Sequence, residues 1–228
     1  NKGVDFVVNI GSSLRSSQNT LELTKKYPFI YGTLGVHPET EEQFGDTEAA
    51  WIENASRNEK IVAIGETGFD YYWDSVSKEE QKERFIRQIE IARKVNLPLV
   101  IHSREAAAHT LRLMKEQRCD EIGGVIHCFS YSWEMAKEFL AMGFYIGVGG
   151  VVTFKNGKVL KDVVKQTPIE RIVLETDSPY LSPEPNRGKR NDSSNIHYIA
   201  QEVAKIKGME KEEIICITSE NAKKLYRL

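Results

Sequence analysis

Cysteine is scarce in this chain of 228 residues, and its three copies are not spaced for metal or disulfide chemistry. Cys119, Cys128 and Cys216 form no CxxC pair, and an odd number of cysteines cannot pair completely. This pattern argues against a disulfide framework and against a cysteine zinc site, and it is typical of proteins in a reducing compartment. We therefore expect a cytoplasmic protein.

Long hydrophobic runs and a surplus of charge of one sign are also missing. No apolar stretch approaches the roughly 18 residues that a membrane helix requires, and no signal peptide is recognisable. The formal net charge is −2, so a polyanionic partner would have to be held by a local basic patch or by metal ions. No low-complexity tract or linker divides the chain. We expect one domain over residues 1–228, with neither a membrane partner nor an obligate protein partner.

Short β-branched and apolar runs, in contrast, recur along the whole chain and alternate with longer amphipathic segments. Uninterrupted apolar runs of this length predict strands of a parallel sheet that is covered on both faces. The predicted strands are Val4–Ile10, Phe29–Gly35, Ile61–Ile64, Leu99–Ile101, Gly124–Ile126, Phe144–Val148 and Arg171–Leu174.

Helices are predicted in the segments between these runs. Ser77 and Glu80 have the spacing of a capping box at the start of one helix. A second helix is expected over 133–142, ended by Gly143, and an apolar stripe from Ile196 to Ile206 predicts a third. A last helix is expected to start near Thr218.

Alternating strands and helices indicate an α/β fold, for which two architectures compete. A closed (β/α)8 barrel needs eight strands, whereas a doubly wound open sheet tolerates seven. The chain starts with Asn1, almost directly at a strand. We expect a TIM-like (β/α)8 barrel whose first βα unit, about 25–30 residues by the usual size of such units, is missing from this chain.

Four metal-ligand side chains follow four separate predicted strands. Glu66, His102, His127 and Asp177 each lie just beyond an apolar run. In a barrel the carboxyl ends of all strands meet at one rim, where catalytic groups gather. Two imidazoles and two carboxylates suit zinc, manganese or magnesium.

Each of these residues alone also has a purely structural interpretation. Glu66 could cap a turn, His102 and His127 could be buried and hydrogen-bonded, and Asp177 could open an Asx-turn before Ser178. Together they are harder to explain in this way. Three of the five histidines, namely His37, His102 and His127, end an apolar run. A polar group at such a place is expensive to bury unless it is paired or liganded.

Five segments resemble the successive signature blocks of the TatD family of deoxyribonucleases, in the family's order. They are Gly35–Pro38, Ile64–Tyr72, Ile101–Arg104, Ile126–Ser130 and Glu175–Pro179, and the similarity continues to Arg187–Asn191. One block would be weak evidence, whereas five in order cover essentially the whole chain.

The resemblance implies a barrel of the metal-dependent hydrolase type that cleaves phosphodiester bonds of DNA, with RNA as a second candidate substrate, as an exonuclease. It implies Glu66, His102, His127 and Asp177 as ligands of two divalent ions (Mg, Mn or Zn), with Glu66 bridging them and Asp177 accepting the proton of the attacking water. The family's His-x-His pair on the first strand is not found in this sequence.

Substrate contacts are expected from cations and rings beside these ligands. Arg104 is placed to pair with a phosphate oxygen, or to form an ordinary salt bridge. His37 is a candidate for substrate contact, with buried capping as its alternative, and Arg187 belongs to a basic loop that could hold a nucleic-acid backbone. Residues 71–73, Tyr-Tyr-Trp, could stack an unpaired base or serve packing.

Two other functions remain open at this point. The same metal rim also supports hydrolysis of small amides, esters or lactones, although the cations favour a phosphate. A barrel with an incomplete metal site could instead only bind nucleic acid without cleaving it.

Overall fold

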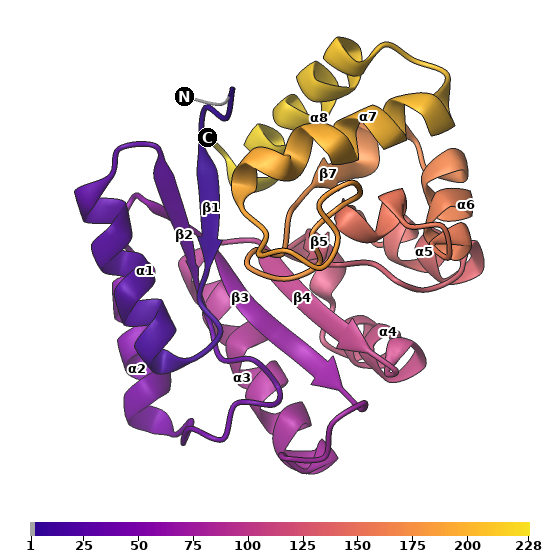
Figure 1. Ribbon diagram of the computed structural model, residues 1–228. Helices are drawn as coiled ribbons and strands as arrows, with labels where there is room; N and C mark the ends of the chain where they lie inside the picture. The colour runs from indigo at the N-terminus through magenta and orange to yellow at the C-terminus, as the bar shows by residue number, and fades with distance from the viewer. Residues whose placement is uncertain (1–2) are drawn as a thin grey trace. The chain divides into compact units, whose positions relative to one another are not determined.

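The computed structural model describes residues 3–228, which form two compact units. The first covers 5–125, and the second covers 126–228 together with residues 3–4. All seven predicted strands are present as β1 to β7 in chain order, alternating with helices, so the α/β fold class is confirmed (Figure 1). Each unit is described by itself.

The first unit is a parallel sheet whose strands follow one another in chain order. The strands β1 (Val7–Ile10), β2 (Ile30–Leu34), β3 (Ile61–Asp70) and β4 (Leu99–Arg104) pair successively. Helices α1 (Leu14–Lys26), α2 (Asp46–Ala55) and α3 (Lys78–Val95) connect them, and α4 (Ala107–Glu116) follows β4. β5 (Gly124–Ile126) begins at the end of this unit.

The core of this unit lies between the sheet and α3. Ile64 and Ile101 on the strands, and Phe85 and Ile89 on the helix, are all buried. The helix begins where it was predicted, because the Ser77 side chain accepts a hydrogen bond from the Glu80 backbone N–H at 3.2 Å. This packing holds α3 against β3.

β3 is longer than the sequence indicated and contains an irregularity. It was expected to end at Ile64 but continues to Asp70. The pairing runs from Ile64 with Leu99 to Thr67 with Ile101, so β3 has one residue more than β4 between these pairs. Such a bulge re-aims side chains locally, and here it contains Glu66.

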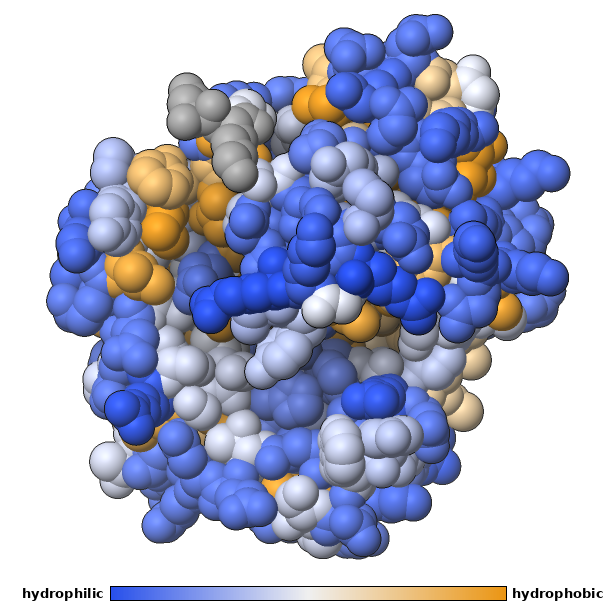
Figure 2. Space-filling model, in the orientation of Figure 1, coloured by the Kyte–Doolittle hydropathy of each residue, from blue (hydrophilic) through white to orange (hydrophobic). Residues whose placement is uncertain are grey.

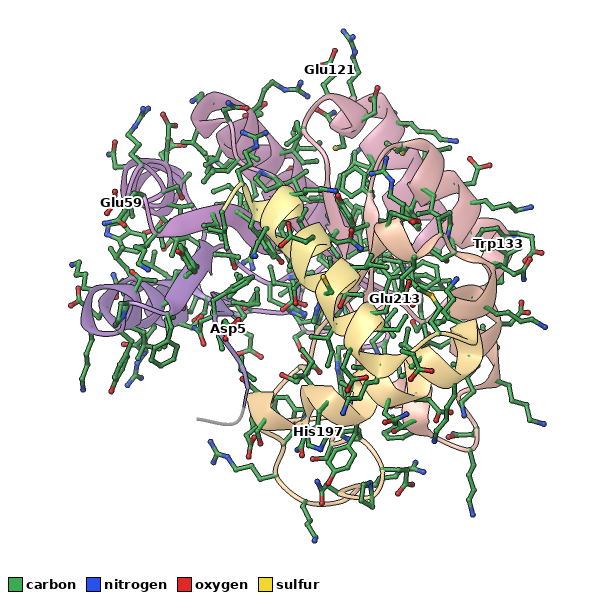
Figure 3. The ribbon with its side chains drawn as sticks, turned by 90° about the horizontal axis from the view of Figure 1, so that it is seen from above. Asp5, Glu59, Glu121, Trp133, His197 and Glu213 are labelled. Atoms are coloured by element: carbon green, nitrogen blue, oxygen red, sulfur yellow. The ribbon has the colours of Figure 1, made fainter. Side chains whose placement is uncertain are left out.

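The second unit continues the alternation of strands and helices. Its strands β6 (Tyr145–Val148) and β7 (Ile172–Leu174) are parallel neighbours. The helices are α5 (Trp133–Ala141), α6 (Lys158–Gln166), α7 (Ile196–Lys207) and α8 (Lys211–Tyr226); Figure 3 labels His197 on α7 and Glu213 on α8. Short 3-10 turns lie at Gly150–Thr153, Ile169–Arg171 and Ser193–Asn195.

The last helix begins earlier than predicted, at Lys211 instead of near Thr218. Its buried residues Ile214, Thr218, Asn221 and Leu225 lie on one face. The Asn221 amide donates hydrogen bonds to the carbonyl oxygens of Ile169 and Ile172, at 2.7 and 2.8 Å, and so holds α8 at the start of β7.

No helix within residues 3–228 is long and apolar enough to cross a membrane. The face of the molecule in Figure 2 is mostly hydrophilic, with small separate hydrophobic patches.

Candidate functional site

The carboxyl ends of β2, β3 and β4 bring a cluster of imidazoles and carboxylates together in the first unit. His37 follows β2, Glu66 and Asp70 belong to β3, and His102 lies on β4. One ligand atom from each of His37, Asp70 and His102 lies within 4.8 Å of the others, a spacing that can hold a metal ion.

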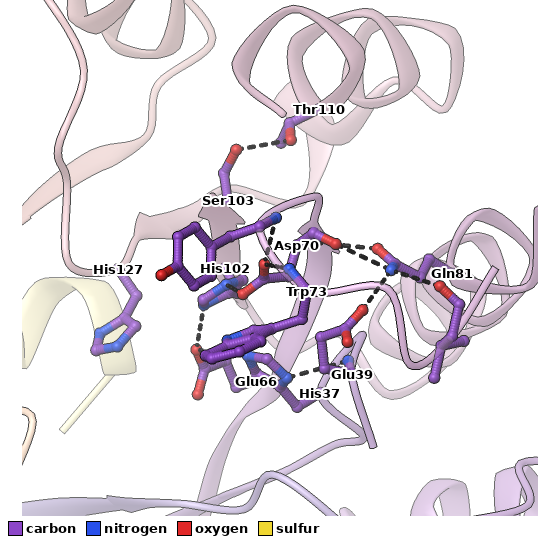
Figure 4. A network of polar contacts seen from close by, with 12 residues as sticks. His37, Glu39, Glu66, Asp70, Trp73, Gln81, His102, Ser103, Thr110 and His127 are labelled. Carbon is purple, nitrogen blue, oxygen red and sulfur yellow. Dashed lines mark hydrogen bonds and ion pairs between the residues drawn. The ribbon is translucent and has the colours of Figure 1, made fainter. Parts of the chain in front are cut away.

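His102 is the centre of this cluster (Figure 4). Its Nδ1 lies 2.8 Å from Glu66 Oε1, and its Nε2 lies 2.9 Å from Asp70 Oδ2. The His37 ring packs edge-on against the His102 ring with centroids 4.3 Å apart, and His37 Nε2 is 3.9 Å from Glu66 Oε1. Two carboxylates and two imidazoles therefore share a space of a few ångströms.

Asp70 connects this cluster to the loop that follows β3. Its Oδ2 contacts His102, while its Oδ1 accepts hydrogen bonds from the backbone N–H groups of Tyr72 and Trp73, at 2.9 and 3.4 Å. Burial of the Asp70 carboxyl opposes ionisation, but the hydrogen bond and charge of His102, together with these donors, outweigh it and lower the pKa of Asp70. Asp70 is therefore a buried carboxylate that stays ionised.

Two buried glutamines on α3 hold the segments that carry His37 and Asp70. The Gln88 amide accepts from the Val36 N–H at 2.8 Å and donates to the Val36 carbonyl and to Thr67 Oγ1. The Gln81 amide accepts from the Asp70 N–H at 3.0 Å and donates to the Asp70 carbonyl and to Glu39 Oε1. Both segments are thus fixed to the same helix.

β3 and β4 approach each other very closely at Gly68, which pairs with His102. Gly68 has φ +141°, and a Cβ placed there would lie 2.0 Å from the His102 carbonyl oxygen. Only glycine permits this approach, so the pairing of β3 with β4 beside His102 requires a glycine at position 68.

The second unit holds a further imidazole–carboxylate group built from the residues that follow β5 and β7. His127 Nδ1 lies 2.7 Å from Glu175 Oε2, and His127 Nε2 lies 3.5 Å from Asp177 Oδ1. Glu175 Oε1 also accepts from the Cys128 N–H at 2.6 Å. A histidine that donates Nδ1–H to a carboxylate presents the lone pair of Nε2, the usual arrangement of a metal-ligating histidine.

The surroundings of this second group are charged and partly buried. Burial, together with the negative charge of Glu175, raises the pKa of Tyr226 above its usual value, so the phenol stays neutral. Asp177 has φ +53°, in the left-handed region that aspartate tolerates better than most side chains. A non-glycine residue held there is often functional.

Both groups fit divalent metal ions by the chemistry of their donors. Imidazole nitrogen and carboxylate oxygen suit zinc and manganese, and the carboxylates also suit magnesium. His37, Glu66, Asp70 and His102 are the candidate ligands in the first unit, and His127 and Asp177 are those in the second.

The guanidinium groups of Arg104 and Arg187, two of the predicted substrate contacts, lie over aromatic rings. The Arg104 guanidinium stands over the Tyr72 ring at 3.8 Å from its centroid and 6.0 Å from that of Trp73. In the second unit the Arg187 guanidinium stands over the Phe154 ring at 4.3 Å. His37, predicted as a substrate contact, belongs to the imidazole–carboxylate cluster.

One carboxylate in each of the two groups was not singled out from the sequence, namely Asp70 in the first unit and Glu175 in the second. Asp70 was missed because β3 was expected to end six residues earlier, so that its side chain did not count as strand-terminal. Glu175 directly follows β7 and carried the same positional signal as Asp177. The roles of Gln81 and Gln88 had no signal in the sequence beyond being polar positions on the buried face of a helix.

Comparison with known proteins supplies evidence about the family of this chain that does not depend on the geometry of the site. The family model described as TatD related DNase matches residues 1–227. The metal-dependent hydrolase YabD of Bacillus subtilis is 44% identical over 99% of this chain and 88% of its own length. The 3′-5′ ssDNA/RNA exonuclease TatD of Escherichia fergusonii is 34% identical over 98% of this chain and 88% of its own.

Solved structures agree with the sequence relatives. The crystal structure of the TatD homologue YJJV from Escherichia coli matches with a TM-score of 0.93 and 27% identity, over 100% of this chain and 88% of that one. An Escherichia coli phosphotriesterase homology protein, at 15% identity and a TM-score of 0.67 over 99% and 85% of the two chains, shares the fold alone. This chain is therefore a metal-dependent hydrolase of the TatD family with a TIM-barrel type of fold.

Proposed function

We propose that this protein cleaves phosphodiester bonds of DNA, and of RNA as a second substrate, as a metal-dependent exonuclease. The observation that carries the proposal is the cluster of His37, Glu66, Asp70 and His102, whose donors suit hard and borderline cations, with the Arg104 cation on the same strand as His102. A neutral ester would need no such cation, whereas a phosphodiester is an anion. The relative named as an ssDNA/RNA exonuclease supports the same substrate class.

We assign Glu66 and His102 of the first unit, and His127 and Asp177 of the second, as ligands of two divalent ions. Asp70, which contacts His102 Nε2, is a further candidate ligand in the first unit. When bound, such cations supply Lewis acidity and lower the pKa of a bound water. Glu175 fixes the His127 ring through Nδ1 and so keeps Nε2 directed toward Asp177.

Asp177 is the candidate general base. Its carboxylate lies 3.5 Å from His127 Nε2, and 32% of its side chain is exposed, so an attacking water can reach it. A carboxylate in this position accepts the proton that the water loses as it attacks phosphorus.

Arg104, His37 and Arg187 are the candidate substrate contacts. The guanidinium groups of Arg104 and Arg187 pair with phosphate oxygens through two parallel N–H donors. His37, with 21% of its side chain exposed, either contacts the substrate or protonates the leaving oxygen.

A substrate panel tests this proposal. Protein stripped with EDTA and then supplied with Mg²⁺, Mn²⁺ or Zn²⁺ is assayed on a labelled DNA strand, a labelled RNA strand, p-nitrophenyl acetate and a lactone. We expect metal-dependent release of nucleotides and little ester hydrolysis. Faster hydrolysis of the ester or lactone would show a carbonyl hydrolase, and nucleic-acid binding without cleavage under every metal would show a binding protein.

A further inference from the structure

Two aromatic side chains and one cation form an exposed cluster at the end of the sheet of the first unit. Tyr72 and Trp73 are 50% and 54% exposed, and their rings meet edge to face with centroids 4.7 Å apart. The Arg104 guanidinium covers the Tyr72 ring at 3.8 Å. We call Tyr72, Trp73 and Arg104 the aromatic platform.

Packing does not explain the aromatic platform, as the neighbouring Tyr71 shows. The Tyr71 ring packs against Phe69 with centroids 5.6 Å apart, and its hydroxyl hydrogen-bonds His109 Nδ1. The loop therefore turns one of its three aromatic residues inward and leaves about half of the surface of the other two exposed, and exposed apolar surface contributes nothing to the stability of the fold.

The aromatic platform is tied directly to the imidazole–carboxylate cluster. The same Asp70 carboxylate that contacts His102 Nε2 accepts the backbone N–H groups of Tyr72 and Trp73. On the other strand, Arg104 lies two residues beyond His102, and its carbonyl accepts the Tyr71 N–H at 2.9 Å. In Figure 4 Trp73 is drawn beside Asp70 and His102. Both sides of the platform are thus held at a fixed place next to the cluster.

We infer that the aromatic platform binds an unpaired nucleobase of the strand whose phosphodiester is cut. The inference rests on the proposed function and adds a subsite to it. Trp73 offers the stacking surface, Tyr72 supports it edge-on, and Arg104 supplies a positive charge for the adjoining phosphate. Aromatic side chains stack on any base, and an arginine plane does so as well.

Stacking at this place predicts the kind of end that the enzyme accepts. A base inside a duplex is already stacked and paired, and taking it out costs several kcal/mol. An unpaired terminal base carries no such cost, so single-stranded ends should be preferred over blunt duplex ends. Because every base has a π-face, the preference should depend little on base identity.

Kinetic comparison of a normal end with an abasic end tests the subsite. Two single strands differ only in whether the terminal nucleotide carries its base, and kcat/KM is measured on both for the unaltered protein, Trp73→Ala, Trp73→Phe and Phe29→Ala. We expect the unaltered protein to prefer the base-bearing end by about 5- to 150-fold, the range of one stacked base. Trp73→Ala should lose that preference, and Trp73→Phe should retain part of it.

Phe29 is the matched control, because it is 48% exposed and precedes β2, at the opposite end of that strand from His37. Phe29→Ala should therefore keep the full preference for the base-bearing end. Thermal melts of each variant identify any that fails to fold. If Trp73→Ala does not fold, the reduced preference of Trp73→Phe tests the inference instead.

A binding measurement in EDTA separates this inference from the proposed function. Fluorescence anisotropy of a labelled single strand should report weaker binding to Trp73→Ala than to the unaltered protein, whether or not the protein cleaves. Equal affinity of the two proteins, or an undiminished preference for the base-bearing end in Trp73→Ala, would overturn the inference. If neither nucleic acid is cleaved under any metal but binding still depends on Trp73, the exonuclease proposal fails and the base subsite stands.

Discussion

His102 has a carboxylate at each ring nitrogen, and His127 has one at Nδ1 and one beside Nε2. An imidazolium satisfies both carboxylates by donating from its two nitrogens, whereas a neutral imidazole donates from one and leaves the other carboxylate facing a lone pair. In the neutral form, a cation between that lone pair and that carboxylate is favourable for both. At the scale of single residues, each group thus offers donors for either a proton or a metal ion.

Asp177→Asn should abolish phosphodiester hydrolysis more completely than it weakens metal binding. An amide oxygen still binds a cation weakly but cannot accept the proton of the attacking water, and losing a positioned base costs about 10²–10⁴ in rate. Arg104→Ala, in contrast, should act partly through KM, because it removes a phosphate contact. The measurement is kcat, KM and metal stoichiometry at one ionic strength, since phosphate binding depends on salt. Near-normal kcat in Asp177→Asn would reduce Asp177 to a ligand or a turn residue.

The sequence placed single residues correctly relative to the strands where it placed the strand ends correctly, while their roles as ligands stay predictions. His102, His127 and Asp177 were placed after apolar runs, and each of those runs is a strand. Asp70 was missed because β3 continues past its apolar run and pairs with β4 as far as Arg104, and no local pattern encodes this pairing or the bulge that precedes it.

Helix α3 is the element that fixes the cluster of the first unit, through Gln81 and Gln88. Both side chains are buried, and each forms three or more hydrogen bonds to segments beside the cluster. Buried polar groups of this kind specify one arrangement of the segments that they join.

Gln88→Ala should lower both stability and metal affinity. It leaves the Val36 N–H and carbonyl without their buried partner, which costs roughly 2–4 kcal/mol, and it loosens the segment that carries His37. Chemical unfolding in EDTA and calorimetric metal titration measure the two effects. Glu90→Ala, at an exposed position of the same helix, is the control and should change neither quantity. Unchanged metal affinity in a destabilised Gln88→Ala would limit this glutamine to a role in folding.

Helices α6 and α7 are joined by an ion pair that should make stability depend on pH. Glu202 Oε1 lies 2.8 Å from Lys161 Nζ, with Lys205 nearby. Burial opposes ionisation of Glu202, but the two lysines outweigh it and lower the pKa. The folded-state pKa is thus below the unfolded value of about 4.3, so the contribution is present above that pH and is lost as pH falls through the folded value.

Glu202→Gln should therefore cost about 0.5–1 kcal/mol at pH 7 and almost nothing at pH 3. Urea unfolding at both pH values checks this, with the exposed Glu213→Gln as control. Identical pH dependence in Glu202→Gln and the unaltered protein would contradict the assigned role of the pair.

At the level of elements, the sequence pattern predicted the presence of the seven strands, the start of α3 and the bounds of α5 and α7 to within one residue, because apolar runs and caps are local signals. Gly143 and Gly208 end α5 and α7 in left-handed backbone, as expected of C-terminal glycines. The start of α8 was wrong by seven residues, because residues 214–217, Ile-Ile-Cys-Ile, form an apolar run in which the helical period is visible only once the buried face is known.

For the whole molecule, family membership and fold converge from three directions: the order of the motifs, the family model over residues 1–227 and the likeness to solved TatD structures. The predicted extent of one domain and the assignment of individual ligands remain predictions.

Divalent metal should also stabilise the fold, because a ligand that binds only the folded state raises its unfolding free energy by about 2.7 kcal/mol at a concentration of 100 Kd.

The most direct measurement follows bound metal and hydrolysis on the same samples. Protein stripped of metal is titrated with Mn²⁺, and at each step bound Mn²⁺ and the release of nucleotides from a single DNA strand are recorded. Hydrolysis should be absent in EDTA, should rise with bound Mn²⁺, and should fall together with metal content in Glu66→Ala and His102→Ala. Full-rate hydrolysis in EDTA, or full Mn²⁺ occupancy without any release of nucleotides, would contradict a metal-dependent nuclease.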